Sequence, residues 1–231
     1  LNMQLASFKL TNGGRNTIGV WASHSYIDLH ALTGGQLPAD MLAFLQLGDT
    51  GMHAARAALK QLDAQLDTTA LARLRGPSGD RYAYTPAEVV LAAPVPRPGK
   101  IMHTSCNFTA HLSELTTWAE PEWQSHNWKD FHFEHPTGFL EAPSSVVASG
   151  AKVPVPHFTK QLDYEIEIAI IIGKPAFRVS IADAMDYVAG YTIFNDLSAR
   201  DIQAREHSNK VILLGKSFNG SCPFGPHLVT P

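Results

Sequence analysis

The stretch from Leu162 to Ile172 constrains the fold of this chain more than any other. Its side chains alternate with the two-residue period of a β-strand. One face is entirely apolar and carries Leu162, Tyr164, Ile166, Ile168, Ile170 and Ile172. The other face carries Asp163, Glu165, Glu167 and Ala169. Neighbouring carboxylates repel one another unless a positive charge lies between them. We therefore expect a strand in the interior of a sheet, with a divalent cation as the simplest partner of its acids.

Composition limits the kinds of partner that this strand can serve. With 231 residues, 45% of them hydrophobic, the chain can bury a substantial core. A formal net charge of -3 argues against a nucleic-acid partner or an anionic membrane surface. No apolar run of about 18 residues and no leader segment is visible, so we expect no membrane contact and a cytoplasmic location. Cys106 and Cys222 are far apart in sequence and are expected to be reduced, buried thiols.

The first part of the chain predicts a small β-rich module with two helices. Loose alternation over residues 3–30, interrupted by Asn12-Gly13-Gly14, predicts a hairpin and a third short strand at Tyr26–Leu29. Helical patterns follow at Pro38–Leu47 and Thr50–Leu66. Several prolines then punctuate the chain around residue 96. We expect an α+β protein with an N-terminal module at 1–96 and a second unit at 97–231.

His111 and Glu114 are three residues apart, which makes them neighbours on one face of a helix. Such a pair can act as a general base and the carboxylate that orients it. The alternative is an exposed contact on a helix surface, worth a few tenths of a kcal/mol (about 0.2–0.5). Spacing alone leaves both interpretations open.

Residues 115–139 form an unusually aromatic segment, with Trp118, Trp123, Trp128, Phe131, Phe133 and Phe139 among histidines and acids. The spacing of the histidines does not fit a zinc site. A long loop of this kind favours a lid or a binding loop. A dimer contact is the alternative.

A polar cluster follows the strand predicted at Tyr191–Asn195, and Asp196 in it is the natural third carboxylate beside Glu165 and Glu167. Mg²⁺, Mn²⁺ and Ca²⁺ prefer such oxygen ligands, and Lys216 could add a positive charge nearby. Two glutamates at i and i+2 are also common on solvent-facing strands. The spacing therefore favours neither a metal site nor an exposed acidic face.

Several motifs in a fixed order strongly resemble the fumarylacetoacetate hydrolase superfamily, from about Lys100 to the last residue. They are Asn107-Phe108-x-x-His111-x-x-Glu114, Asp163-Tyr164-Glu165-x-Glu167, Asn195-Asp196-x-Ser198-Ala199-Arg200-Asp201-x-Gln203, Lys216-Ser217-Phe218 and Cys222-Pro223-x-Gly225-Pro226. The resemblance implies a mixed, rolled β-sheet core and a homodimer. It also implies specific roles for nine side chains.

The resemblance assigns these roles in three groups. The implied ligands of Mg²⁺, or of Mn²⁺ or Ca²⁺, are Glu165, Glu167 and Asp196. The implied catalytic residues are His111, Glu114 and Lys216. The implied substrate contacts are Phe108, Arg200 and Gln203. Asp163 has no ligand role in this pattern, so we interpret it as a supporting or structural acid.

The implied substrates are small 2-oxo or 2,4-dioxo acids, whose enolates a bound cation stabilises. With a water activated by His111, a carbon–carbon bond of an acylpyruvate-like substrate is hydrolysed, and this metal-dependent hydrolase is our first hypothesis. Decarboxylation of a 2-oxo acid and isomerisation of a 2-hydroxy-diene-dioate are alternatives on the same scaffold. A non-catalytic metal-binding scaffold domain is the alternative from another class.

Two departures from the family pattern stand out. Glu141 occupies a place where relatives often carry lysine, which reverses the local charge. The family core is also expected to continue beyond the Gly225-Pro226 segment, so the sequence predicts a core that is incomplete at its C-terminus. Exposed sheet edges would follow from that.

Overall fold

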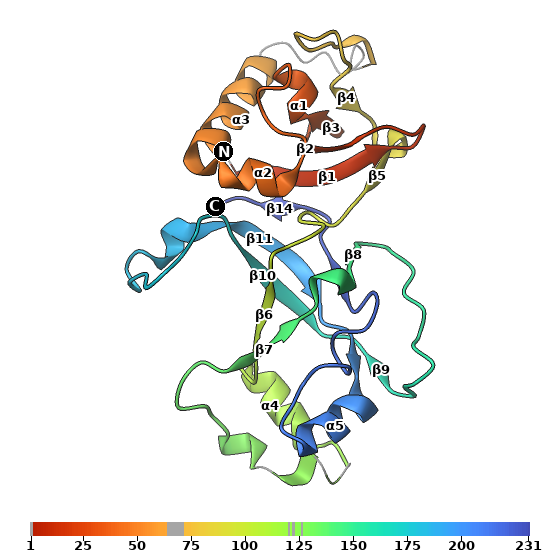
Figure 1. The fold of residues 1–231 in the computed structure, drawn as a ribbon, viewed down its shortest axis with the longest axis vertical. Helices are drawn as coiled ribbons and strands as arrows, with labels where there is room; N and C mark the ends of the chain where they lie inside the picture. Colours follow the sequence, from red (N-terminus) through yellow and green to blue (C-terminus); the bar gives the residue numbers. More distant parts are fainter. Residues whose placement is uncertain (1, 64–71, 120, 122, 126) are drawn as a thin grey trace.

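The structure is a computed structural model that describes residues 2–63, 72–119, 121, 123–125 and 127–231. The elements of the first part of the chain are β1 (Gln4–Leu10), β2 (Asn16–Ala22), β3 (Ser25–Asp28), α1 (Leu29–Leu32), α2 (Met41–Gln46), α3 (Gly48–Asp63), β4 (Ala83–Tyr84), η2 (Pro86–Glu88) and β5 (Val89–Leu91). The elements of the second part are β6 (Ile101–Thr104), α4 (Thr109–Leu115), η3 (Trp123–Ser125), η4 (Trp128–Asp130), β7 (Gly138–Glu141), η5 (Pro143–Ser145), β8 (Val146–Ala148), β9 (Leu162–Asp163), β10 (Ile166–Ile172), η6 (Ala184–Tyr187), β11 (Val188–Asn195), β12 (Ser198–Ala199), α5 (Arg200–Ser208), β13 (Cys222–Phe224) and β14 (Leu228–Val229). Figure 1 shows α1, α2 and α3 at one end of the molecule and α4 and α5 at the other.

The N-terminal hairpin and the third strand are confirmed. β1 and β2 pair antiparallel with Leu5 opposite Val20, and β3 pairs with β2. Both helices are also present, and α2 begins after Asp40, whose carboxylate accepts a hydrogen bond from the Ala43 amide. Residues 64–66 of the second predicted helix lie outside the described residues.

A mixed ten-stranded sheet runs through both parts of the chain. Its main path is β4-β3-β2-β1-β14-β11-β13-β8, and β5 and β10 pair with β1 and β11 respectively. The pairs are antiparallel except β13 with β8, which is parallel. The main buried cluster draws side chains from both parts, including Leu5, Phe44, Phe194 and Leu228. The α+β class with a mixed sheet is therefore confirmed, whereas the division at residue 96 stays a prediction.

The acidic stretch from Leu162 to Ile172 is interrupted rather than continuous. Tyr164 and Glu165 separate β9 from β10, and β9 pairs with β12 in a separate two-stranded sheet. Within the described residues β10 pairs with β11 alone, so it is an edge strand and the expected interior position is wrong. Its apolar face is the outer one, because Ile166, Ile168, Ile170 and Ile172 are all more than half exposed.

The inner face of β10 carries the acidic side chain of Glu167 together with Ala169 and Ile171, which pack against the main core. The two-residue alternation therefore holds within β10 but not across the break at Tyr164 and Glu165. In β10 the apolar face points outward and the face with Glu167 points inward, the reverse of an ordinary amphipathic strand. Burial of the acidic face requires positive partners for its carboxylates.

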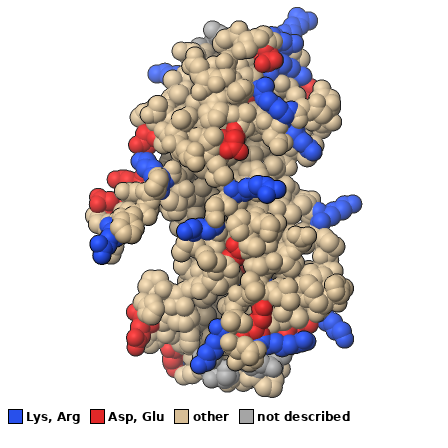
Figure 2. All heavy atoms as spheres, viewed as in Figure 1, with Lys and Arg blue, Asp and Glu red and all other residues tan. Residues whose placement is uncertain are grey.

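Charged side chains in the view of Figure 2 are spread over the whole length of the molecule, with uncharged surface between them. Both cysteines are free thiols, Cys222 buried and Cys106 half-buried. Across the described ranges, the helices are too short or too polar to cross a membrane.

Candidate metal and substrate site

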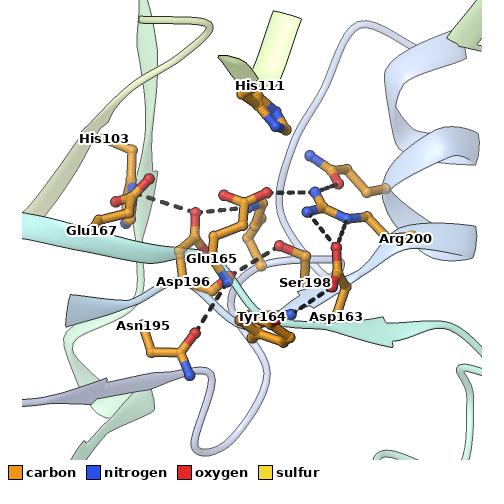
Figure 3. A network of polar contacts seen from close by, with 12 residues as sticks. His103, His111, Asp163, Tyr164, Glu165, Glu167, Asn195, Asp196, Ser198 and Arg200 are labelled. Atoms are coloured by element: carbon orange, nitrogen blue, oxygen red, sulfur yellow. Dashed lines mark hydrogen bonds and ion pairs between the residues drawn. The ribbon is translucent and has the colours of Figure 1, made fainter. Parts of the chain in front are cut away.

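The candidate site lies where the end of β11 meets the start of β10. The Asn195 side chain accepts a hydrogen bond from the Glu165 amide at 3.1 Å, and the Asp196 amide donates to the Glu165 carbonyl at 2.9 Å. These contacts hold the Glu-x-Glu segment beside the Asn-Asp segment (Figure 3). The backbone therefore brings together carboxylates that are about thirty positions apart in sequence.

The predicted ligands Glu165, Glu167 and Asp196 do converge, because one carboxylate oxygen of each lies within 4.8 Å of the others. Asp196 is 1% exposed, and among the described residues no group donates a hydrogen bond to its buried Oδ1. A buried carboxylate oxygen without a donor is costly unless a cation or a water fills the position. The donor set and this orphaned oxygen fit a hard divalent cation. The ligand roles themselves stay a prediction.

Lys216 supplies one positive charge to this cluster from within the protein. Its side chain is 2% exposed, and its Nζ lies 2.7 Å from Asp196 Oδ2 and 3.0 Å from Glu165 Oε2. Burial by itself would raise the pKa of Glu165, but Lys216 and Arg200 hold it well below its usual range. Burial raises the pKa of Asp196 despite the opposing charge of Lys216. The two neighbouring carboxylates are thus pushed in opposite directions.

Arg200, at the start of α5, is held on three sides. Its Nε and Nη2 donate to Asp163 Oδ2 at 2.9 and 2.7 Å. Its Nη1 donates to Gln203 Oε1 at 3.0 Å and forms an ion pair of 2.5 Å with Glu165 Oε1. The guanidinium also lies 4.8 Å from the centre of the Trp118 ring. Asp163 therefore holds Arg200 in place, a contact that the sequence did not identify, and its supporting role stays a prediction.

His103 is a member of the site that the sequence analysis did not single out. Its Nε2 donates to Glu141 Oε2 at 2.9 Å, and its Nδ1 lies 3.5 Å from Glu167 Oε2 and 3.4 Å from Asp196 Oδ2. Burial by itself would lower the pKa of His103, but hydrogen bonds to Glu141 and Glu167 raise it to about 9. The sequence held one signal for His103. Alternation in β6 puts its side chain on the same, less exposed face as Ile101, so a polar side chain is expected there in the interior.

Glu141 is 3% exposed, and its other oxygen accepts a hydrogen bond from Ser221 at 2.9 Å. The family pattern led us to expect a lysine at this position. The glutamate found there instead is hydrogen-bonded to the buried side chain of His103. Phe139 stacks on the His103 ring with a centroid distance of 4.6 Å and an interplanar angle of 3°. The imidazole is thus fixed in both position and orientation.

His111 and Glu114 lie on α4, and Nδ1 of the histidine is 3.4 Å from Oε2 of the glutamate. In Figure 3 the His111 ring extends from its helix toward the carboxylates, without a drawn contact to them. Both residues line the same cavity as Glu165 and Lys216. The arrangement leaves His111 free to approach a bound molecule, and its catalytic role stays a prediction.

The cavity has a volume of about 1160 Å³. Phe108 lines it and is 53% exposed, and Gln203 lines it beside Arg200. The aromatic segment forms another wall through Trp118, Trp123, Trp128, Phe131, Phe133 and Phe139. Trp123 and Trp128 also pack against Ala204 of α5. Residues 120, 122 and 126 of the segment, including His126, lie outside the described residues.

Comparison with known proteins gives consistent matches. The sequence profile of the fumarylacetoacetate (FAA) hydrolase C-terminal domain matches residues 100–231. The oxaloacetate tautomerase YisK of Bacillus subtilis (strain 168) is 40% identical over 150 residues, which cover 64% of this chain and 45% of that protein. The mitochondrial oxaloacetate tautomerase fahd2 of Xenopus laevis is 30% identical over 232 residues, covering 100% of this chain and 62% of that protein. The chain therefore spans about half to two thirds of these relatives.

Solved structures share the fold over nearly the whole chain. Fumarylacetoacetate hydrolase from Exiguobacterium antarcticum superposes with a TM-score of 0.64 at 26% identity, covering 99% of this chain and 66% of the other. Maleylpyruvate hydrolase from Sphingobium sp. SYK-6, solved in complex with manganese(II) and pyruvate, gives a TM-score of 0.65 at 25% identity, covering 99% of this chain and 67% of the other.

Proposed function

Because this chain belongs to the fumarylacetoacetate hydrolase family, we propose that it is a divalent-metal-dependent enzyme that interconverts the keto and enol forms of an oxaloacetate-like 2-oxo acid. The observation that carries the proposal is the convergence of Glu165, Glu167 and Asp196 with the buried ammonium of Lys216. The tautomerase names of the relatives at 30% and 40% identity support the choice of reaction. The sequence left hydrolysis, decarboxylation and isomerisation of a 2-hydroxy-diene-dioate open.

The cation would be held by Glu165, Glu167 and Asp196, and it would supply Lewis-acid polarisation of the 2-oxo acid's oxygens. Mg²⁺ and Mn²⁺ both suit the oxygen donors, and the manganese in the maleylpyruvate hydrolase structure supports Mn²⁺. Two positively charged side chains of the protein itself have separate roles beside the cation. Lys216 keeps Asp196 and Glu165 close together without mutual repulsion, and Arg200 presents a fixed positive charge to an acidic substrate.

Tautomerisation moves a proton between the carbon beside the keto group and the keto oxygen: a C–H bond breaks as an O–H bond forms on the way to the enol, and the reverse occurs on the way to the ketone. His111 is the proposed carrier of this proton, because it lines the cavity and Glu114 orients its Nδ1. No attacking water is needed for this reaction. The same residues could direct a water at a 2,4-dioxo acid, which would cleave a carbon–carbon bond instead.

Hydrolysis of an acylpyruvate-like acid is therefore the second candidate, and the cavity favours it. A volume of about 1160 Å³ with a wall of aromatic side chains could hold an acyl group larger than any part of oxaloacetate. The likeness to maleylpyruvate hydrolase supports this candidate as well. The homodimer and the cytoplasmic location stay predictions for either reaction.

The test uses purified protein with Mn²⁺ or Mg²⁺ and two parallel assays. Decay of the enol absorbance of oxaloacetate reports tautomerisation, and loss of the dioxo chromophore of a panel of acylpyruvates reports hydrolysis. We expect Glu167→Gln and His111→Ala to reduce the rate in whichever assay is positive, while His53→Ala, which alters an exposed histidine on α3, leaves it unchanged. Full activity of both site variants would overturn the proposal, and turnover in the second assay alone would replace tautomerisation by hydrolysis.

A further inference from the structure

We propose that His103 is a fourth ligand of the metal, a nitrogen donor held in place by Glu141 and Ser221, and that the site therefore prefers Mn²⁺ and later first-row ions over Mg²⁺ and Ca²⁺. This inference rests on the metal site of the proposed function. It goes beyond that site because the ligands implied by the family pattern are all carboxylates. The inference depends on which atoms of the imidazole face which neighbours.

The first step concerns the outer nitrogen of His103. Nε2 lies 2.9 Å from Glu141 Oε2, and a carboxylate can only accept, so Nε2 carries the hydrogen. The second oxygen of Glu141 accepts from Ser221, and Glu141 is 3% exposed. A carboxylate that binds one nitrogen of a histidine commonly orients the other nitrogen toward a metal. Here the carboxylate is itself fixed by a further hydrogen bond.

The second step concerns the inner nitrogen. Nδ1 faces Glu167 Oε2 at 3.5 Å and Asp196 Oδ2 at 3.4 Å. Ligand atoms at adjacent corners around a cation with bonds of about 2.1 Å lie roughly 3 Å apart. These separations are close to that value and longer than those of most charge-assisted hydrogen bonds. Nδ1 thus lies near one oxygen of each of two carboxylates, and a cation bound there would replace the proton that Nδ1 otherwise holds between them.

The third step concerns the sharing of Asp196. This residue belongs to both groups of possible ligands, one with Glu165 and Glu167 and the other with His103 and Glu141. Its Oδ1 is buried and without a hydrogen-bond donor among the described residues, although Lys216 occupies Oδ2. Asp196 is the residue that the two groups share, so a cation held by Asp196 and the two glutamates would take its nitrogen ligand from His103.

The chemical consequence is a change of selectivity. Oxygen-only sites suit Mg²⁺ and Ca²⁺, whereas an imidazole ligand favours ions later in the first transition row. The stacking of Phe139 on the imidazole and the edge contact of Phe194, at 4.6 and 5.3 Å, restrict rotation of the ring. The ring cannot easily turn away to leave a carboxylate-only site.

The test measures metal binding, not turnover. Metal-free protein is titrated with Mn²⁺, Co²⁺ and Mg²⁺ by calorimetry, for the wild type, His103→Ala, Glu141→Gln and the control His53→Ala. We expect His103→Ala to weaken Mn²⁺ and Co²⁺ binding by at least about tenfold, and Glu141→Gln by about tenfold. Mg²⁺ binding should change less than about threefold. His53→Ala should match the wild type for every ion.

A second measurement needs no variant and so survives a folding defect in His103→Ala. Pulsed electron paramagnetic resonance of Mn²⁺-loaded wild type should show nitrogen modulation from a histidine, and selective ¹⁵N labelling of histidine should change that modulation. Mn²⁺ binding without nitrogen modulation, or equal loss of Mn²⁺ and Mg²⁺ in His103→Ala, would overturn the fourth ligand but leave the carboxylate site standing. Absence of binding by any of the three ions would overturn the metal site and this inference together.

Discussion

The Nζ atom of Lys216 lies 2.7 Å from Oδ2 of Asp196, and both side chains are only 2% exposed. A buried ion pair contributes little by its mere presence, but removal of one partner leaves an uncompensated charge in the interior. From this contact we predict that loss of Lys216 lowers the free energy of unfolding as well as disturbing the site.

Replacement of Lys216 by methionine should lower the free energy of unfolding by about 3–5 kcal/mol, because Asp196 and Glu165 lose their shared cation. Urea denaturation measures the change. The matched control is Lys174→Met, which breaks an exposed ion pair with Asp49 and should cost less than about 1 kcal/mol. Equal costs for the two variants would contradict the buried role of Lys216.

Replacement of Asp163 by asparagine should loosen Arg200, since Oδ2 accepts from two of its nitrogens. Loss of charge-assisted hydrogen bonds worth about 1.5–3 kcal/mol should reduce kcat/KM by roughly ten- to a hundredfold. The thermal midpoint should fall by no more than about 2–4 °C, because Asp163 is 39% exposed and solvent screens the ion pair. Steady-state kinetics and calorimetric scans check the two parts separately, and unchanged kinetics would remove Asp163 from the site.

Addition of Mn²⁺ to the metal-free protein should raise the free energy of unfolding by about 2.7 kcal/mol at one hundred times the dissociation constant. Glu167→Gln should lose most of this gain, since it removes one of the converging carboxylates. Asp49→Asn, on the exposed surface of α3, is the control and should retain it. Thermal scans at several metal concentrations make the comparison. The metal site is contradicted if both variants respond alike.

The pH dependence of stability should show a contribution from Glu88. Hydrogen bonds from Arg81 and Thr85 lower the pKa of Glu88 from its ordinary value of 4.5 to about 2. A lowered pKa stabilises the folded state above pH 4.5, and this stabilisation is lost as the pH falls toward 2. Because the side chain is 39% exposed, solvent screening limits the contribution to about 1 kcal/mol or less.

Thermal midpoints of the wild type and Glu88→Gln between pH 2 and 7 measure this contribution. The difference between the two proteins should be constant above about pH 5 and should vanish near pH 2. A difference that grows toward low pH has the wrong sign and would rule out the ion pair with Arg81 as its cause.

Much of the site followed from short-range patterns. Alternation predicted Glu165 and Glu167 on one face, and the polar cluster after the next strand predicted Asp196 as a third carboxylate, whereas the role of Arg200 was implied by the family resemblance. What could not be predicted depends on pairing between distant segments. The edge position of β10 follows from which strands lie beside it, and period-two alternation contains no information about neighbours.

His103 and Glu141 illustrate the same limit at the site. They are 38 residues apart and meet because β6 and β7 pair in a separate hairpin-like sheet. Glu141 was noticed as a reversed charge, but its partner became evident only in three dimensions. A reversed charge in a buried strand is itself a signal to look for a compensating residue on the paired strand.

The short strand β14 has a consequence for how the protein opens. Val229 pairs with Gln4 of β1 on one side and with Tyr191 of β11 on the other, and Gly190 allows this approach because a Cβ there would lie 2.4 Å from the Val229 carbonyl oxygen. β11 runs on from this pairing to Asn195, the residue directly before Asp196. Amide hydrogens of β1, β14 and β11 are therefore expected to exchange in one cooperative event, so that local opening of β1 would also disturb the carboxylates at the end of β11.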